Sequence, residues 1–195
     1  VMSKNQAAGR SMVTELVSKV KAAAASRLDR RLAARRREAP RPASLQATTG
    51  RLTRNIIAIG SSTGGPEALS RVLSPLPSQT PGIVIVQHMP PTFTASLAER
   101  LDRGSRLNVR EARDGDAIVP GTALIAPGDR HLLVQGAPGR YRVELRDGPK
   151  VGLHKPAVDV MFKSLEKIGG RDAVAVLLTG MGADGADGMV ALRRA

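Results

Sequence analysis

Three apolar runs along the chain have the length and composition of strands that are buried on both faces. They are Asn55–Ile59, Gly82–Val86 and Ala173–Leu178. Each is rich in branched aliphatic residues and stops at a cluster of glycine and polar residues, which is typical of strands in a parallel sheet. Apolar residues at helical spacing, with proline or glycine at the ends, predict helices at about 66–73, 92–101 and 156–168.

A strand, a helix and a second strand follow one another between Asn55 and Val86, and this order implies parallel strands with a right-handed crossover. The segment Leu107–Gly148 differs, because short apolar runs alternate with D-G and P-G turns, the pattern of β-hairpins. These runs are Leu107–Glu111, Ala123–Ala126, His131–Val134 and Tyr141–Leu145. We therefore predict an α/β fold with three layers (α/β/α), built on a mostly parallel, Rossmann-like sheet with an antiparallel β-hairpin extension.

The N-terminal part of the chain has a different composition. Apolar residues at helical spacing between Met12 and Leu28 predict an amphipathic helix, and the arginine-rich and then proline-containing stretch after it is typical of a linker. We therefore divide the chain into a helix and basic linker at 1–51 and a folded domain at 52–195.

The net positive charge of the chain is concentrated in this N-terminal part. The net charge is +13, and residues 1–54 hold 13 of the 30 Lys and Arg residues but only 3 of the 17 Asp and Glu residues. Aromatic residues make up only 2% of the chain, so the stacking positions that single-stranded nucleic acids use are missing. The composition therefore does not favour specific binding of nucleic acid.

Other function classes are limited by what the sequence lacks. The chain has no cysteine, which excludes disulfides, a thiol nucleophile and cysteine-ligated zinc. No apolar run approaches the length of a membrane span, and no signal peptide is visible. We expect a cytoplasmic protein that does not insert into a membrane and that uses neither a metal nor a cofactor.

The turn after the first strand carries the strongest chemical signal. Gly60–Gly64 fits the pattern G-x-S-x-G, which holds a serine on a sharp turn between a strand and a helix. Ser62 is thus a candidate nucleophile. A glycine-rich turn at a helix start can also hold a phosphate, so a phosphate- or nucleotide-binding module stays open as an alternative. The chain lacks both G-x-G-x-x-G and the lysine of a P-loop, which disfavours that alternative.

Two further strand ends supply a base and an acid. His88 follows the second strand at the edge of the sheet where Ser62 lies, and it is the candidate general base. Asp184 follows the third strand in a glycine-rich loop and is the candidate acid that orients the imidazole. Asp187 competes for that role, although an acid in the first turn of a helix suits the helix dipole.

The remaining candidate groups are two histidines and three backbone amides. His131 falls in a predicted hairpin strand, where a structural role is expected, and His154 is either exposed or directed at a substrate. The N–H groups of Thr63 and Met181 are the predicted donors to an oxyanion, with the His88 amide as a further candidate.

Five separated motifs occur in an order that is characteristic of one family. They are G-S-S-T-G-G-P-E-A-L, V-Q-H-M-P-P-T-F-T, A-P-G-D-R-H, H-K-P-A-V-D-V-M-F and L-T-G-M-G-A-D-G-A-D-G-M. From about Asn55 to the C-terminus, the chain resembles the catalytic domain of the bacterial chemotaxis protein-glutamate methylesterases of the CheB type. The resemblance implies a three-layer α/β fold with Ser62 as nucleophile, His88 as base and Asp184 as acid.

The resemblance also implies a substrate and a regulatory partner. Members hydrolyse glutamate γ-methyl esters on the cytoplasmic helices of chemoreceptors, release methanol, and in many cases deamidate receptor glutamines. They are two-component response regulators whose N-terminal receiver domain relieves inhibition when it is phosphorylated. Residues 1–51 would then be the tether to a receiver that this sequence does not include. The family continues for a further helix and strand after the last motif, so we expect a C-terminally truncated domain, and an inactive truncated member is a further alternative.

Overall fold

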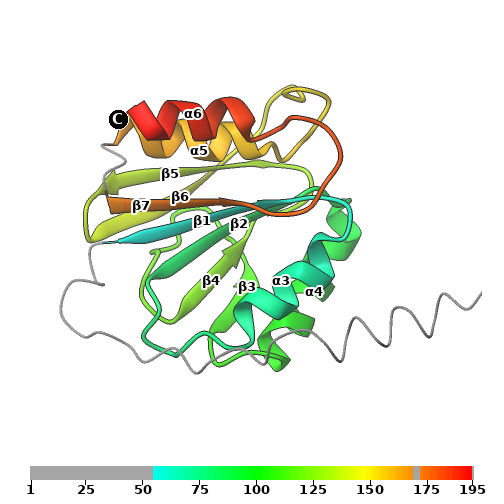
Figure 1. Ribbon diagram of the computed structural model, residues 1–195, viewed down its shortest axis with the longest axis vertical. Helices are drawn as coiled ribbons and strands as arrows, with labels where there is room; N and C mark the ends of the chain where they lie inside the picture. Colours follow the sequence, from blue (N-terminus) through cyan, green and yellow to red (C-terminus); the bar gives the residue numbers. More distant parts are fainter. Residues whose placement is uncertain (1–54, 169–171, 195) are drawn as a thin grey trace, which may run out of the picture. The chain divides into compact units, whose positions relative to one another are not determined.

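The computed structural model describes residues 55–168 and 172–194 (Figure 1). The amphipathic helix and basic linker predicted for 1–51 lie outside the described residues, so that part of the domain division stays a prediction. Within the described ranges, no helix is both long enough and apolar enough to cross a membrane.

Five parallel strands form the central sheet. In order across the sheet they are β3 (Asn108–Glu111), β4 (Thr122–Ile125), β2 (Gly82–Gln87), β1 (Ile56–Ser61) and β7 (Ala173–Leu177). Every neighbouring pair runs parallel. The predicted parallel α/β sheet is confirmed, and β1 and β2 occupy its centre, so the turns that follow them leave the sheet side by side.

Helices cover both faces of this sheet (Figure 1). On one face lie α3 (Gly65–Leu73) and α4 (Pro91–Arg103), and on the other lie α5 (Val158–Lys167) and α6 (Ala186–Arg194). The helix α3 begins directly after Gly64, which has a left-handed φ of 77°, and a proline occupies its first turn. The predicted three-layer arrangement is therefore present.

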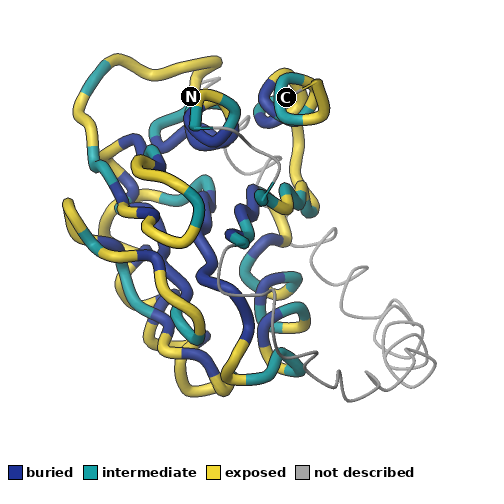
Figure 2. Tube along the Cα trace, turned by 90° about the vertical axis from the view of Figure 1, so that its left-hand side faces the viewer, coloured by how far each residue is buried: buried dark blue, intermediate teal, exposed yellow. Residues whose placement is uncertain are grey.

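Two apolar cores fill the space between the layers. One contains Leu69 of α3 and Leu97 of α4 with Ile85 of β2, and the other contains Phe162 of α5 with Val84 of β2. Val84 and Ile85 enter different cores because successive side chains of a strand point to opposite faces. Both are fully buried, at 0% exposure. Figure 2 shows these buried positions as dark blue segments through the middle of the domain.

The antiparallel hairpin is also present, as a sheet of its own. Its strands are β5 (His131–Ala137) and β6 (Arg140–Arg146). The hairpin packs on α5, where the hydroxyl of Ser164 accepts a hydrogen bond from the Val134 N–H at 2.8 Å and donates one to the Met161 carbonyl at 2.6 Å. Ser164 thus joins the hairpin to the helix layer.

The hairpin interpretation is wrong for two of the four runs. Leu107–Glu111 and Ala123–Ala126 contribute to β3 and β4, which pair in parallel within the central sheet. The ten residues between these strands, 112–121, include the D-G and P-G turns and contain no helix. Because a parallel crossover usually contains a helix, its absence here made the sequence pattern resemble a hairpin.

Within the described residues, the apolar strand β7 lies at the edge of the central sheet. This position makes it less buried than its sequence indicates. It pairs with β1 on one side. The side chains of Val174 and Leu177 are 50% and 40% exposed. An apolar sequence therefore predicted the strand correctly but not its place at an edge, because burial depends on a second neighbour.

Replacing Ser164 with alanine should weaken the attachment of the hairpin. The Val134 N–H would be left buried without an acceptor, and we expect the free energy of unfolding to fall by about 1–3 kcal/mol. Ser96→Ala is the matched control, because the Ser96 hydroxyl bonds to the Phe93 carbonyl on the exposed side of a helix. The control should change stability by less than about 0.5 kcal/mol. Urea unfolding of both variants gives the comparison, and equal losses would contradict it.

Candidate active site

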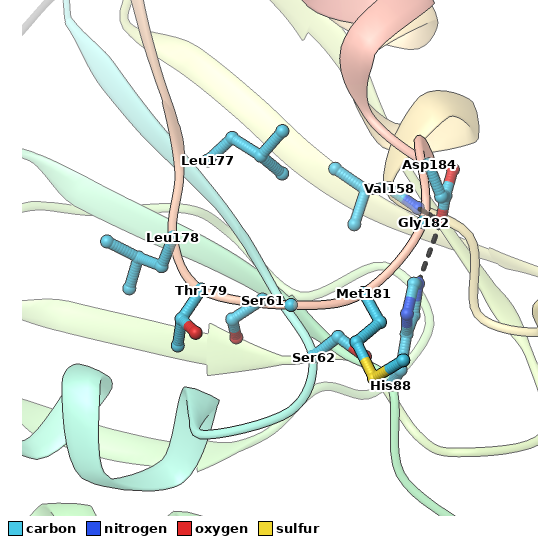
Figure 3. A pocket seen from close by; sticks show the side chains of 11 residues that line it. Ser61, Ser62, His88, Val158, Leu177, Leu178, Thr179, Met181, Gly182 and Asp184 are labelled. Atoms are coloured by element: carbon cyan, nitrogen blue, oxygen red, sulfur yellow. Dashed lines mark hydrogen bonds and ion pairs between the residues drawn. The ribbon is translucent and has the colours of Figure 1, made fainter.

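Three neighbouring strands end at one edge of the sheet and contribute to one pocket. Ser62 follows β1, His88 follows β2, and the loop from Thr179 to Asp184 follows β7. Together these segments line a pocket of about 70 Å³ (Figure 3). Sites of α/β sheets form beyond the carboxyl ends of parallel strands, and this pocket lies there.

The turn that carries Ser62 is fixed by backbone contacts. The Ser62 N–H donates to the Thr179 carbonyl at 2.9 Å, and the Ser62 carbonyl accepts from the Gly65 N–H at 2.8 Å. The loop after β7 passes so close that a Cβ at position 180 would lie 2.9 Å from the Cβ of Ser62. Only glycine permits such an approach, so Gly180 allows the loop to cover the serine turn.

The amide of Gln87 connects the two strand ends that carry Ser62 and His88. Its nitrogen Nε2 donates to the Ser62 carbonyl at 2.9 Å and to the His88 carbonyl at 3.1 Å. Its oxygen Oε1 accepts from the Ser61 hydroxyl at 2.7 Å. Gln87 is only 2% exposed, so these bonds replace those that water would make. One buried side chain therefore sets the spacing of the two backbone segments.

His88 and Asp184 form a buried pair at the wall of the pocket. The ring nitrogen Nε2 of His88 lies 2.7 Å from Oδ2 of Asp184, and the two side chains are 11% and 5% exposed. The same carboxylate accepts the N–H of Val158 at 2.7 Å and that of Asp159 at 3.0 Å, which are the first two residues of α5. Asp184 thus caps α5 from a distant part of the chain.

The contacts of Asp184 decide its charge. Burial of the carboxyl, the largest influence, raises its pKa. The hydrogen bonds from His88 and from the amides of Asp159 and Val158 outweigh burial, so the pKa of Asp184 lies below its usual value. An ionised carboxylate requires a proton on Nε2 of His88, and the neutral ring then has its lone pair on Nδ1.

Nδ1 of His88 is the atom suited to accept a proton. It is buried, and no protein group among the described residues forms a hydrogen bond with it. Ser62 and His88 line the same pocket, as Figure 3 shows, but no hydrogen bond joins them in the described structure. Contacts of this kind often tighten only when the substrate is bound. The structure therefore pairs the predicted base with the predicted acid and places the serine beside them in one pocket.

The predicted oxyanion donors differ in availability. Met181 lines the pocket, and within the described structure the N–H groups of Met181 and Thr63 donate to no protein acceptor. The His88 N–H donates to the Ser61 carbonyl at 3.0 Å, so including it among the oxyanion donors was wrong. An amide that already continues the pattern of strand bonding is not free to bind a substrate oxygen.

The other candidate acid and one of the other histidines lie in positions that do not suit catalysis. Asp187 is exposed in the first turn of α6, and the contact with His88 belongs to Asp184. His131 is buried and bonded to backbone atoms of Pro149 and Ala157, as a structural histidine would be. The described residues contain no cluster of three or more His, Cys, Asp or Glu side chains that could bind a metal ion.

Sequence reasoning missed two contributions from the H-K-P-A-V-D motif. The N–H groups at the start of α5 hold Asp184, and the ring of His154 stacks on the ring of His88, with centroids 3.8 Å apart and planes inclined by 4°. The motif ends 25 residues before Asp184 in the chain. For the N–H groups at the start of α5, one signal was visible in the sequence, a predicted helix start at a proline. For the ring stack, there was none.

A family model described as CheB methylesterase matches residues 57–195, well over half of the chain. The chain belongs to the CheB methylesterase family. It is 54% identical over 182 residues to protein-glutamate methylesterase/protein-glutamine glutaminase 2 of Pseudomonas aeruginosa, covering 93% of this chain and 50% of that protein. It is 50% identical over 154 residues to the protein-glutamate methylesterase/protein-glutamine glutaminase of Escherichia coli, covering 79% of this chain and 44% of that one.

A solved structure in the CheB methylesterase family has the same fold. The catalytic domain of the Thermotoga maritima CheB methylesterase superposes with a TM-score of 0.69 at 45% sequence identity, covering 72% of this chain and 75% of that chain. The chain spans about half the length of the curated relatives it matches. The family and the fold of the chain are thereby shown.

The charge of Asp184 should make stability depend on acid pH. Its pKa is lower in the folded protein than in the unfolded chain, where Asp titrates at about 3.9, so the ionised form stabilises the fold. This stabilisation is complete above that pH and is lost as the pH falls through the folded-state pKa. We expect the free energy of unfolding to fall more steeply below about pH 4 in the parent than in Asp184→Asn.

The control for this pH dependence is Asp129→Asn, at an exposed carboxyl in a loop. Chemical unfolding at a series of pH values between neutrality and acid gives the slopes. The control should follow the parent. A parent slope equal to that of Asp184→Asn would show that the contacts of Asp184 do not favour its ionised form.

Replacing Gln87 with leucine should destabilise the domain even though the two side chains have similar sizes. The carbonyls of Ser62 and His88 and the hydroxyl of Ser61 would lose their partner, so we expect a loss of about 1–3 kcal/mol in the free energy of unfolding. Gln135→Leu on the exposed side of the hairpin is the control. Thermal and urea unfolding measure both variants, and a Gln87→Leu protein as stable as the parent would contradict the bridging role.

Proposed function

We propose that this chain is a serine hydrolase that removes methyl groups from glutamate γ-methyl esters of chemoreceptors and releases methanol. The observation that carries the proposal is the buried His88–Asp184 pair, at 2.7 Å, in the wall of a pocket that Ser62 also lines. The names of the relatives, protein-glutamate methylesterase/protein-glutamine glutaminase, support both this activity and the deamidation of receptor glutamines.

In the first half of the proposed reaction, Ser62 attacks the carbonyl carbon of the side-chain ester. Its proton passes to Nδ1 of His88, and Asp184 stabilises the imidazolium that forms. The N–H groups of Thr63 and Met181 hold the negative oxygen of the tetrahedral intermediate. The intermediate then expels methoxide, which takes the proton from His88 and leaves as methanol, and a glutamyl ester of Ser62 remains.

In the second half, water replaces methanol. His88 accepts a proton from water as the water oxygen attacks the acyl carbon. The second tetrahedral intermediate then expels the Ser62 alkoxide, which takes the proton back from His88. The product is an unmodified glutamate side chain on the receptor. A glutamine side chain follows the same steps with ammonia as the leaving group, which accounts for a deamidase activity at the same site.

The dimensions of the pocket favour a side chain as substrate. A volume of about 70 Å³ is far below that of a typical ligand pocket, roughly 300–1,000 Å³. It admits the end of one side chain that projects from a larger surface. Met181, at the mouth, is 79% exposed and offers an apolar contact to the segment that carries the ester. These features fit an ester on a receptor helix. We further propose, from the family to which the chain belongs, a cytoplasmic location and regulation by an N-terminal receiver domain.

A phosphate- or nucleotide-binding role fits the pocket less well. Among the described residues that line it, none is Lys or Arg, and one is the ionised Asp184. A bound phosphate would be repelled by that carboxylate and would meet no balancing cation. The glycine turn therefore favours a serine reaction over anion binding.

Replacing Ser62 with alanine should abolish the activity without disturbing the fold. Loss of one member of such a triad lowers the rate by about 10⁴-fold or more. Methanol release from methylated receptor membranes measures the rate, and labelling with a fluorophosphonate followed by peptide mass spectrometry locates the reactive residue. Ser96→Ala is the control, and its activity and labelling should match the parent. A folded parent that neither labels at Ser62 nor releases methanol would end the proposal.

A further inference from the structure

We infer that His154 is a positioning residue for His88, and this inference rests on the proposed function. The two rings are nearly parallel, inclined by 4°, with centroids 3.8 Å apart. Aromatic pairs in proteins usually prefer offset or edge-to-face arrangements with centroids about 4.5–7 Å apart. The shorter separation here brings the two ring faces into direct contact.

The need for such a contact follows from the bonds of His88. One ring nitrogen is bonded to Asp184, while Nδ1 has no partner among the described residues. A single hydrogen bond at one corner fixes the position of that corner but leaves the ring free to tilt about it. A flat group packed against the ring face removes this freedom. The stack with His154 therefore keeps Nδ1 directed at the position where it must accept the proton of Ser62.

The turn that carries His154 is closed by its own backbone. The N–H of Val151 donates to the His154 carbonyl and the N–H of His154 donates to the Val151 carbonyl, both at 3.0 Å. The two residues between them have left-handed φ angles, 55° at Gly152 and 76° at Leu153. A positive φ is uncommon for leucine, whose side chain is also 86% exposed here. Neither burial of Leu153 nor the backbone preference of leucine explains the conformation of this turn. The turn does, however, determine the position of the His154 ring.

The ends of the same loop are held by the buried ring of His131. Its Nε2 lies 2.9 Å from the Pro149 carbonyl, and its Nδ1 accepts the Ala157 N–H at 3.2 Å. Lys155 adds an ion pair with Asp147 at 2.7 Å. These bonds join the loop before and after the turn to the hairpin, which packs on α5. The ring of His154 is thus supported by the same helix whose first residues hold Asp184.

The stack also affects the charged state of His88. When His88 accepts the proton of Ser62 it becomes a cation, and the face of an aromatic ring attracts a cation. His154 would therefore contribute more in the transition state than in the resting enzyme. A phenylalanine at position 154 supplies the same flat face without a group that exchanges protons, whereas a glutamine supplies neither a ring nor an attractive face.

The test compares His154→Ala, His154→Gln and His154→Phe in the full chain. We expect the alanine and glutamine variants to lower both kcat for methanol release and the rate of fluorophosphonate labelling at Ser62. The decrease should be roughly three- to thirtyfold, between the effect of one aromatic stack and that of a misplaced catalytic group. His154→Phe should stay within about threefold of the parent, and KM should change by less than about twofold in all three.

Lys150→Ala is the control, because Lys150 is exposed on the same loop. NMR adds a readout that a merely structural role would not move. Ring stacking shifts the ring proton signals of His88, so these signals should move in the alanine and glutamine variants and stay near the parent position in His154→Phe. The chain contains only 3 histidines, which makes the assignment direct.

The outcomes separate this inference from the proposed function. If the parent labels at Ser62 and His154→Ala and His154→Gln react as fast as the parent, the inference is wrong and the proposed function stands. If His154→Phe is as slow as His154→Ala, the imidazole has chemistry of its own and the positioning role is also wrong. If His154→Ala does not fold, the comparison of glutamine with phenylalanine decides. A parent that fails to label refutes the proposed function itself.

Discussion

The carboxylate of Asp184 is bonded on one side to the start of α5 and on the other to His88, and the geometry of the site depends on this double contact. The hydrogen bonds from His88 and from the two N–H groups at the start of α5 keep the carboxylate ionised despite its burial. An ionised acceptor in turn fixes which ring nitrogen of His88 carries a proton. The contacts that a helix start makes with Asp184 thus help to determine which ring nitrogen of His88, just after β2, can act as the base.

The helix that holds Asp184 is itself connected back to the loop containing it. Asp159, in the first turn of α5, accepts the N–H of Gly188 near the start of α6 at 2.7 Å. Each helix start is therefore capped by a carboxylate from the other segment. Close packing requires small residues here, since a Cβ at position 188 would lie 2.6 Å from the Cβ of Phe162. The reciprocal caps hold the loop after β7 in one position relative to α5, and the reach of Asp184 follows from that.

The sequence predicted those parts of the site that follow from parallel strands. Ser62, His88 and Asp184 each come after an apolar run, and the carboxyl ends of neighbouring parallel strands meet at one edge. The contribution of His154 was not predictable in this way, because a ring stack depends on how a separate loop folds over the sheet. The crossover between β3 and β4 was mistaken for a hairpin because it contains turns and no helix. The exposure of Val174 likewise depends on its neighbours in space, which its own sequence does not specify.

The two halves of the site, Ser62 with His88 and Asp184 with His154, are supported by different layers of the domain. Ser62 and His88 directly follow two central strands, and the buried amide of Gln87 bonds to both of their carbonyls, so their backbones share one rigid support. Asp184 and His154 approach from the other layer, where α5 and the loop before it set their positions. A change that shifts α5 against the sheet would therefore move the acid and the stacked ring together, away from a serine and a base that stay in place. Such a change would alter the ring orientation and charge of His88 before it altered the turn of Ser62.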